Sequence, residues 1–381
     1  MMKKVTIPAP LIVVIEDVGW WNGFDGSAVN QPFRTGIGRG HCSEDYRTLV
    51  KLGKELGIQI IAGFAWCEWD RFNVLKKTPT ATWMGEQWDN PEKNSPFFEE
   101  TIDIINNNPA HIELAFHGLG HEYWKDDIPQ RTEFHDLHGN MRSENDIKNH
   151  FHCFEEIYQK SGIKAALPVI FIPPALKHSF GNQYSGFQKI LNDYGYKVVI
   201  TAFDKAKQHS DPLYKNFTKE CGITLVERGL SPVKWNEVAA QPVFSFQWPV
   251  LGLHWSNILH LDPQKNDRII KMWAGFLKEG VKNHGLILLS GAKEAIVQLI
   301  YSRLSEISMY ENGVTIDITK AQNVLPAFPD ANLHIKVDIN PEDTIKVGGG
   351  VIASSKTNER FEKVLKIIPL GNIIQLKINS D

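Results

Sequence analysis

The chain has 381 residues, a formal net charge of -3 and 42% hydrophobic residues. The small charge excludes proteins that hold nucleic acids or anionic membranes by a strongly basic surface. No stretch reaches the roughly 18–20 apolar residues of a membrane span, and the length predicts two domains.

At the N-terminus, only about five unbroken apolar residues precede Glu16, which is too few for the apolar region of a signal peptide. The four cysteines are scattered and include no C-x-x-C pair, which suits a reducing compartment. We therefore expect a soluble cytoplasmic protein with no membrane span and no nucleic-acid partner.

Strands and helices alternate through the first three-quarters of the chain. The expected strands are 11–15, 58–64, 111–116, 167–172, 197–201, 223–226, 249–254 and 286–289. The expected helices are 43–56, 96–105, 143–161, 185–194, 263–277 and 292–308. This alternation predicts parallel strands with helices outside them. Six to eight strands over about 300 residues suit a (β/α) barrel, whose site gathers at the carboxyl ends of the strands.

The pattern changes from about Glu311. Short segments alternate apolar and polar residues with turn residues between them, at 314–318, 333–339, 344–347, 364–368 and 373–378. This alternation predicts a small antiparallel β-domain, of the sandwich type. We therefore expect a barrel domain at 1–309 and an accessory β-domain at 310–381.

The stretch H-I-E-L-A-F-H-G-L-G-H-E at 111–122 carries the strongest chemical signal. It begins as a strand and ends in His117 and His121, spaced four apart around two glycines that allow a tight turn. Asp17 closes an earlier strand and offers a third ligand. An Asp-His-His shell leaves positions open for water and substrate, as a catalytic zinc site requires. We expect one divalent ion here, zinc, with nickel, cobalt or manganese as alternatives.

Two further residues are candidates for proton transfer. Glu16 could act as a general base, but adjacent strand residues face opposite sides, so a salt bridge outside the site is an equal alternative. His254 ends a later strand in G-L-H-W-S-N and could protonate a leaving group. His260 competes for that role, although flanking leucines favour packing.

Aromatic and acidic residues near the expected strand ends could bind a sugar, because a ring face matches the C–H face of a pyranose. The alternative for the acidic pair is a solvated loop between buried rings. The candidates for substrate binding are Trp20, Trp66, Glu68, Asp70, Pro173 and Trp255.

Four short motifs resemble, in their order, those of the polysaccharide deacetylase (NodB-homology) superfamily of carbohydrate esterases. They are E-D at 16–17, F-H-G-L-G-H at 116–121, F-I-P-P at 171–174 and G-L-H at 252–254. The resemblance covers about residues 5–290. It implies a distorted (β/α)7-type barrel, with a divalent metal on Asp17, His117 and His121. It also implies hydrolysis of an N- or O-acetyl group, with Glu16 as base and His254 as acid.

The chain departs from the family pattern at three places. The family's pair of aspartates is Glu16-Asp17, its Arg before the prolines is Ile172, and its Tyr after them is Ala175. The Arg normally orients the base, whereas the Tyr acts through its backbone, which Ala175 also has. These departures indicate a divergent branch.

The sequence thus predicts a metal-dependent hydrolase that removes an acetyl or other acyl group from a carbohydrate or a small acylated substrate. Two alternatives stay open. One is a barrel that binds a glycan or metal without efficient chemistry, and the missing Arg and Tyr favour it. The other is a metal-free glycosidase that uses paired carboxylates from among Glu16, Asp17, Glu68 and Asp70.

Overall fold

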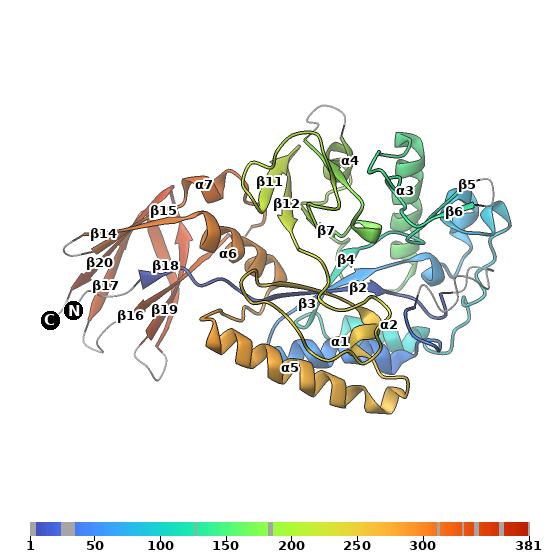
Figure 1. The fold of residues 1–381 in the computed structure, drawn as a ribbon, viewed down its shortest axis with the longest axis horizontal. Helices are drawn as coiled ribbons and strands as arrows, with labels where there is room; N and C mark the ends of the chain where they lie inside the picture. The colour runs from blue at the N-terminus through green and yellow to red at the C-terminus, as the bar shows by residue number, and fades with distance from the viewer. Residues whose placement is uncertain are drawn as a thin grey trace. The chain divides into compact units, whose positions relative to one another are not determined.

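In the computed structural model, the chain forms two compact units: an α/β unit of residues 12–279, and a β-rich unit of residues 1–11 and 280–381 (Figure 1). The structure describes residues 5–23, 35–125, 128–181, 186–310, 313–329, 331–338, 343–357 and 362–379. Within these ranges, no helix has the length and apolar character needed to span a bilayer.

An eight-stranded sheet forms the centre of the α/β unit. In spatial order its strands are β11 (Phe217–Glu220), β12 (Ile223–Glu227), β9 (Val198–Thr201), β7 (Ile170–Phe171), β4 (Ile112–Phe116), β3 (Ile60–Phe64), β2 (Ile12–Val18) and β13 (Val250–His254). Every neighbouring pair is parallel except β11 and β12. The predicted mixed α/β fold with a mostly parallel sheet is therefore confirmed. The described strands form no ladder between β11 and β13 that would close a barrel.

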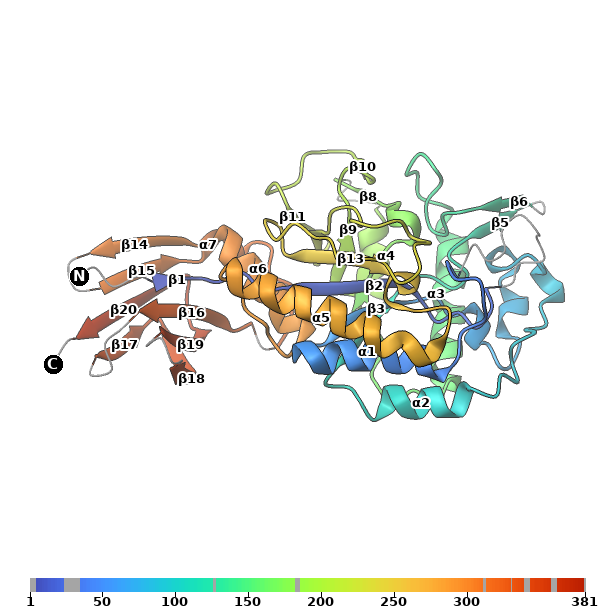
Figure 2. The same cartoon turned by 60° about the horizontal axis from the view of Figure 1, so that its bottom comes forward.

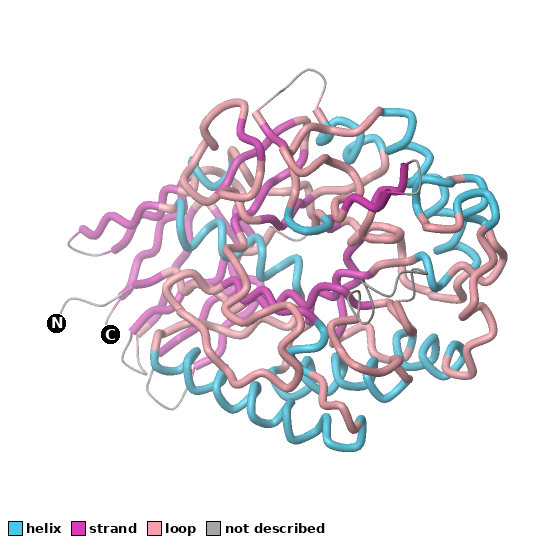
Figure 3. The backbone as a smooth tube through the Cα atoms, turned by 45° about the vertical axis from the view of Figure 1, so that its right-hand side comes forward, coloured by secondary structure: helices cyan, strands magenta, loops and turns pink. Residues whose placement is uncertain are grey.

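Helices flank this sheet, and in Figure 3 helical segments run along its lower and right-hand borders. They are α1 (Ser43–Leu56), α2 (Phe98–Asn106), α3 (Glu144–Lys160), α4 (Phe187–Asp193) and α5 (Asn266–Asn283). In Figures 1 and 2, α1, α2 and α5 lie on the same side of β2 and β3. The apolar stripe of α1 is buried as expected, including Tyr46 and Leu49, and Gly57 ends the helix with a φ of 68°.

Short elements occupy the loops that follow the strands. The 3-10 helices are η1 (Cys67–Trp69), η2 (Val74–Lys77), η3 (Pro79–Ala81), η4 (Gly85–Gln87), η5 (Pro174–Leu176), η6 (Trp255–Ile258) and η7 (Pro263–Lys265). The two-stranded ribbons pair β5 (Tyr123–Lys125) with β6 (Ile128–Gln130), and β8 (Ser179–Phe180) with β10 (Lys207–Gln208). Most of these elements follow the carboxyl end of a central strand, where the candidate site lies.

The β-rich unit contains two four-stranded antiparallel sheets. The spatial order of strands in the first sheet is β1 (Val5–Thr6), β16 (Leu333–Asp338), β19 (Glu362–Pro369) and β18 (Gly350–Thr357). The order in the second sheet is β14 (Glu306–Tyr310), β15 (Gly313–Asp317), β20 (Ile373–Asn379) and β17 (Thr344–Gly348). Helices α6 (Ala292–Leu304) and α7 (Thr319–Gln322) complete this unit. The predicted antiparallel character is confirmed.

Several sequence-based boundaries in the β-rich unit were wrong. The expected strand 286–289 is reduced to one bridge between Ile287 and Pro10, and the helix expected to reach 308 ends at Leu304. Strands β14 and β18 were missed. Their side chains are mostly exposed, so they lack the alternation of buried and polar positions on which a strand prediction depends.

Candidate metal centre

Asp17, His117 and His121 lie together at the carboxyl edge of the central sheet. Strands β2 and β4 are parallel and only β3 separates them, so their ends meet at one edge. The Nε2 atoms of His117 and His121 lie 3.5 and 3.7 Å from Asp17 Oδ1. Among the described residues, this is the only group of three or more potential His, Cys, Asp or Glu ligands whose donor atoms lie within 4.8 Å of one another. The structure thus brings the predicted triad together.

The local backbone explains how adjacent carboxylates reach one site. Regular strand geometry would send Glu16 and Asp17 to opposite faces. Asp17 instead has a φ of 59°, and the pairing of β2 with β3 shifts between Ile15 and Val18. His121 also adopts a left-handed conformation, with a φ of 61°. Such strained backbone in residues other than glycine is concentrated at functional sites.

Hydrogen bonds and charge prepare the triad for a cation. His117 Nδ1 lies 2.8 Å from the Ile172 carbonyl, which only accepts, so Nδ1 carries the hydrogen and Nε2 faces Asp17. Burial alone would raise the pKa of Asp17, but the hydrogen bond from His117 and the charges of His121 and His254 outweigh it and lower that pKa. A carboxylate and two oriented imidazoles fit a divalent ion such as zinc.

Glu16 lies beside the triad and pairs with an arginine that the sequence analysis missed. Arg228 follows β12, and its Nη2 lies 3.0 Å from Glu16 Oε2. Gly252 on β13 makes room for the guanidinium, because a Cβ there would lie 2.2 Å from Arg228 Cζ. The only sequence signal is an Arg between a strand end and a glycine, in V-E-R-G-L at 226–230.

The second oxygen of Glu16 is available for chemistry. Oε1 is buried and has no hydrogen-bond partner among the described residues. His254 lies near Oε2, the oxygen that Arg228 also contacts, with 3.7 Å between His254 Nε2 and Glu16 Oε2. Burial lowers the pKa of His254, and the charges of Asp17 and Glu16 oppose this effect. The candidate base and acid therefore lie close together at the edge that holds the triad.

Ala175 presents a backbone donor at the same edge. Its N–H donates to His121 Nε2 across 3.1 Å, although Ala175 itself is exposed. Ala175 and Leu176 both have positive φ, at 53° and 56°, directly after Pro173 and Pro174. This turn places the Ala175 N–H on the lone pair of His121 Nε2, the atom that would bind an ion, so the ion would have to displace this hydrogen bond.

The aromatic candidates for substrate binding lie in the protein core. Trp20, Trp66 and Trp255 are at most 1% exposed, and Pro173 is also buried. Trp66 packs against the rings of Phe64, Phe154 and Tyr158. No ring face of these tryptophans is open for stacking on a sugar, so the expectation of a stacking platform was wrong for them.

The acidic candidates have structural bonds that the sequence could not show. Glu68 is fully buried and accepts the backbone N–H groups of Trp21, Asn22 and Gly23. Asp70 is 1% exposed and accepts from Phe72 N, Leu75 N and Trp88 Nε1. Both carboxylates therefore hold loops together. The sequence analysis expected either sugar binding or a solvated loop for Glu68 and Asp70, and the structure shows neither arrangement.

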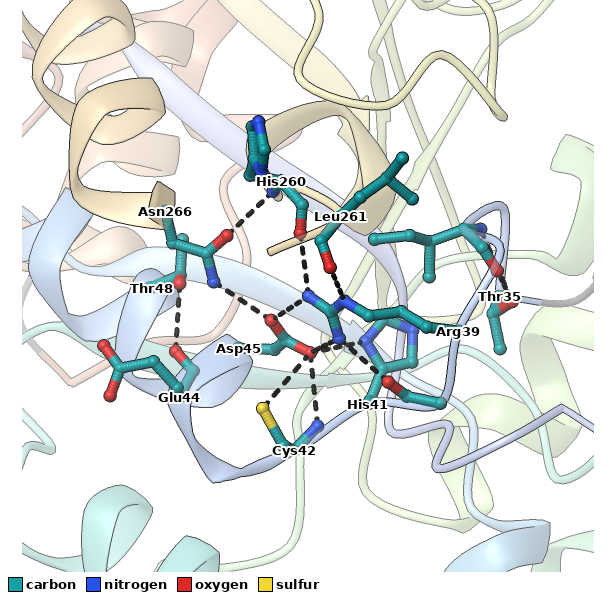
Figure 4. A network of polar contacts seen from close by, with 12 residues as sticks. Thr35, Arg39, His41, Cys42, Glu44, Asp45, Thr48, His260, Leu261 and Asn266 are labelled. Atoms are coloured by element: carbon teal, nitrogen blue, oxygen red, sulfur yellow. Dashed lines mark hydrogen bonds and ion pairs between the residues drawn. The ribbon is translucent and has the colours of Figure 1, made fainter. Parts of the chain in front are cut away.

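A polar network surrounds the Asp45 carboxylate at the start of α1 (Figure 4). The buried carboxylate of Asp45 accepts two hydrogen bonds from Arg39, at 2.6 and 2.7 Å, and one from Asn266 at 3.0 Å. His41 contacts the same carboxylate and stacks on Trp255, with 3.9 Å between ring centroids. The network thus ties the start of α1 to the start of α5 and to the residue after His254.

No family model, no curated protein and no solved structure matches the chain. Any functional conclusion therefore rests on the geometry of the site.

Proposed function

We propose that the α/β unit is a metal-dependent hydrolase that removes an acetyl or similar acyl group from a carbohydrate or other small acylated substrate. The observation that carries the proposal is the convergence of two groups at one sheet edge. The first is the triad Asp17, His117 and His121, and the second is the pair Glu16 and His254. A metal site without chemistry would not need the second group.

Asp17, His117 and His121 would hold the ion, which would lower the pKa of a water molecule and polarise the acyl carbonyl. Glu16 would take the proton of the attacking water at Oε1, while Arg228 holds Oε2. His254 would donate a proton to the departing amine or alkoxide. Binding of the ion to His121 Nε2 would release the Ala175 N–H, which would then be free to donate to the developing negative charge on the acyl oxygen.

We further propose that the central sheet is a distorted (β/α) barrel, open between its two end regions. Two contacts link those regions in the α/β unit. Arg228 after β12 reaches Glu16 on β2, and Trp248 Nε1, just before β13, donates to the Glu227 carbonyl at 2.9 Å. A flat sheet of this strand order would hold β12 and β2 far apart, since four strands lie between them.

The two alternatives are less well supported. The case for an inactive binding protein rested on the missing arginine and tyrosine. Arg228 supplies a guanidinium to Glu16 from another strand, and Ala175 has the backbone N–H through which the tyrosine would act. A metal-free glycosidase would need two carboxylates facing an open cleft. Glu68 and Asp70 are buried and bonded to backbone groups, which removes them from that role. Of the other two candidates, Glu16 pairs with Arg228 and Asp17 lies against two histidines, an arrangement that suits a metal better than a glycosidase pair.

The test combines metal content with activity. We expect about one divalent ion per purified chain, bound through the three ligands. The variants Asp17→Asn and His117→Gln should lose the ion and all turnover on a panel of N- and O-acetylated sugars. A metal-free chain that stays metal-free after soaking with zinc, nickel, cobalt and manganese would refute the proposal. So would a metal-free His117→Gln variant with full activity.

A further inference from the structure

Glu133 holds the turn that carries the second histidine of the triad. One carboxylate oxygen, Oε1, accepts the backbone N–H of Leu119 at 3.0 Å, and the other, Oε2, accepts that of His121 at 2.9 Å. The side chain is completely buried. A buried carboxylate that bridges two amides of one turn restrains the backbone directly beneath the His121 side chain.

A second layer restrains the carboxylate itself. His150 on α3 is 1% exposed, and its Nδ1 lies 2.8 Å from Glu133 Oε1. A carboxylate only accepts, so His150 Nδ1 carries the hydrogen, and Nε2 is free to accept from Thr80 Oγ1 at 2.9 Å. The chain Thr80–His150–Glu133 therefore links η3 and α3 to the ligand turn.

The glycine in the turn is required by this arrangement. A Cβ on Gly118 would lie 2.2 Å from Glu133 Oε2 and 3.1 Å from Pro174 Cγ. Gly118 also has a φ of 92°, which disfavours any side chain. The first glycine of H-G-L-G-H thus gives the carboxylate access to the amides, in addition to allowing the turn.

We infer that Glu133 is a positioning residue for the metal ligand His121, held in place by His150. This inference rests on the proposed function, because it assumes that His121 binds an ion. Groups that orient the ligands of a metal typically change its affinity by roughly 10- to 100-fold when they are replaced. Glu133 acts on the backbone of the ligand and does not itself touch the ion position.

The experiment measures Co²⁺ binding to the full chain by visible absorption, together with amide hydrogen exchange of the metal-free protein. Glu133→Gln replaces one acceptor oxygen by a donor, so one of the two turn amides loses its partner. We expect Co²⁺ affinity to fall by roughly 10- to 100-fold, and exchange at Leu119 and His121 to become faster. Asp136→Asn is the matched control. Asp136 lies in the same loop and accepts two backbone amides, those of His138 and Asn140, but none in the ligand turn.

His150→Leu provides a second variant, since Glu133 keeps both oxygens for the two amides and loses only its contact with the imidazole, while Thr80 loses its acceptor. A smaller loss of affinity in the same direction is expected. If the unmodified chain binds Co²⁺ and both variants bind it equally tightly, this inference is overturned and the proposed function stands. If the unmodified chain binds no Co²⁺, the proposed function fails and the inference fails with it.

Discussion

Arg228 and Glu16 form a buried ion pair across the sheet, with 3.0 Å between Nη2 and Oε2 and side chains only 1% and 4% exposed. Removing one partner of such a pair leaves an uncompensated buried charge, at a cost of about 3–5 kcal/mol. We therefore expect Arg228→Leu to lower the free energy of unfolding by about that amount, measured by urea denaturation.

An exposed ion pair provides the comparison. Arg71 pairs with Glu99 at 2.7 Å, with side chains 34% and 76% exposed. Arg71→Leu should change stability by less than about 1 kcal/mol, because water screens such pairs. Combining Arg228→Leu with Glu16→Leu should recover part of the loss. If Arg228→Leu and Arg71→Leu lower the free energy of unfolding equally, burial of the Arg228–Glu16 pair does not increase its contribution to stability.

Gly252→Ala should disturb the same pair from β13. The added Cβ would lie 2.2 Å from Arg228 Cζ, so the guanidinium must move away from Glu16. We expect a lower free energy of unfolding, by about 1–3 kcal/mol as for other overpacked sites. Gly275→Ala is the control, because nothing lies within 4 Å of its Cβ position inside α5. Gly275→Ala should stabilise the chain by about 0.5–1 kcal/mol. If Gly252→Ala and Gly275→Ala destabilise the chain equally, the steric contact with Arg228 is not the cause.

His254→Gln should separate metal binding from proton transfer. His254 is not among the three grouped ligands, so the variant should keep its metal content. Loss of a general acid typically costs roughly 10²- to 10⁴-fold in rate, which would be measured as kcat on whichever acetylated substrate is turned over. His260→Gln is the control, since His260 Nδ1 accepts the N–H of Asp262. Unchanged kcat in His254→Gln would remove His254 from the mechanism.

Asp45→Asn should loosen the network of Figure 4 without changing the metal site. The amide has one acceptor oxygen and no charge, so the two bonds from Arg39 cannot both be kept. We expect a loss of about 3–5 kcal/mol in unfolding free energy, as for other broken buried pairs. Asp262→Asn is the control, because Asp262 caps η7 by accepting from Gln264, and Asn is an equally good N-cap. If Asp45→Asn is as stable as Asp262→Asn, the prediction is wrong.

Two buried histidines predict a loss of stability in acid. Burial lowers the pKa of His135 to about 3, and burial also lowers the pKa of His178 well below its ordinary value. The unfolded chain takes up these protons near pH 6.5, so below that pH it binds more protons than the folded chain. The free energy of unfolding is therefore not reduced by these histidines above about pH 6.5. Below that pH it decreases by up to about 1.4 kcal/mol per pH unit for each histidine.

Urea denaturation between pH 7.5 and 5 would measure this slope. His135→Gln should reduce it by about one proton's contribution, even if the variant is less stable at every pH. His152→Gln is the control, because the His152 side chain is 67% exposed and so stays largely in water when the chain folds. A slope that is unchanged in His135→Gln would show that another group is responsible.

Local patterns predicted much of the fold. Apolar runs between turn residues located β2, β3, β4, β9, β12 and β13, because strands buried on both faces need continuous apolar side chains. Strand–helix alternation predicted the parallel sheet, and the spacing of His117 and His121 pointed to the turn that carries two of the candidate metal ligands. Exposed strands such as β18 were not predicted, because nearly all of their side chains face solvent and the sequence has no alternation of buried and exposed positions.

The sequence by itself thus determined the order of the elements and the positions of the candidate ligands Asp17, His117 and His121 near strand ends. Tertiary structure decided which distant groups meet: Arg228 with Glu16, Glu133 with the amides of Leu119 and His121, and Glu68 with a backbone loop. Strand and turn propensities act over a few residues, so a short sequence window contains them. A contact between residues far apart in the chain depends on the curvature of the sheet and the packing of whole elements, which no local pattern contains.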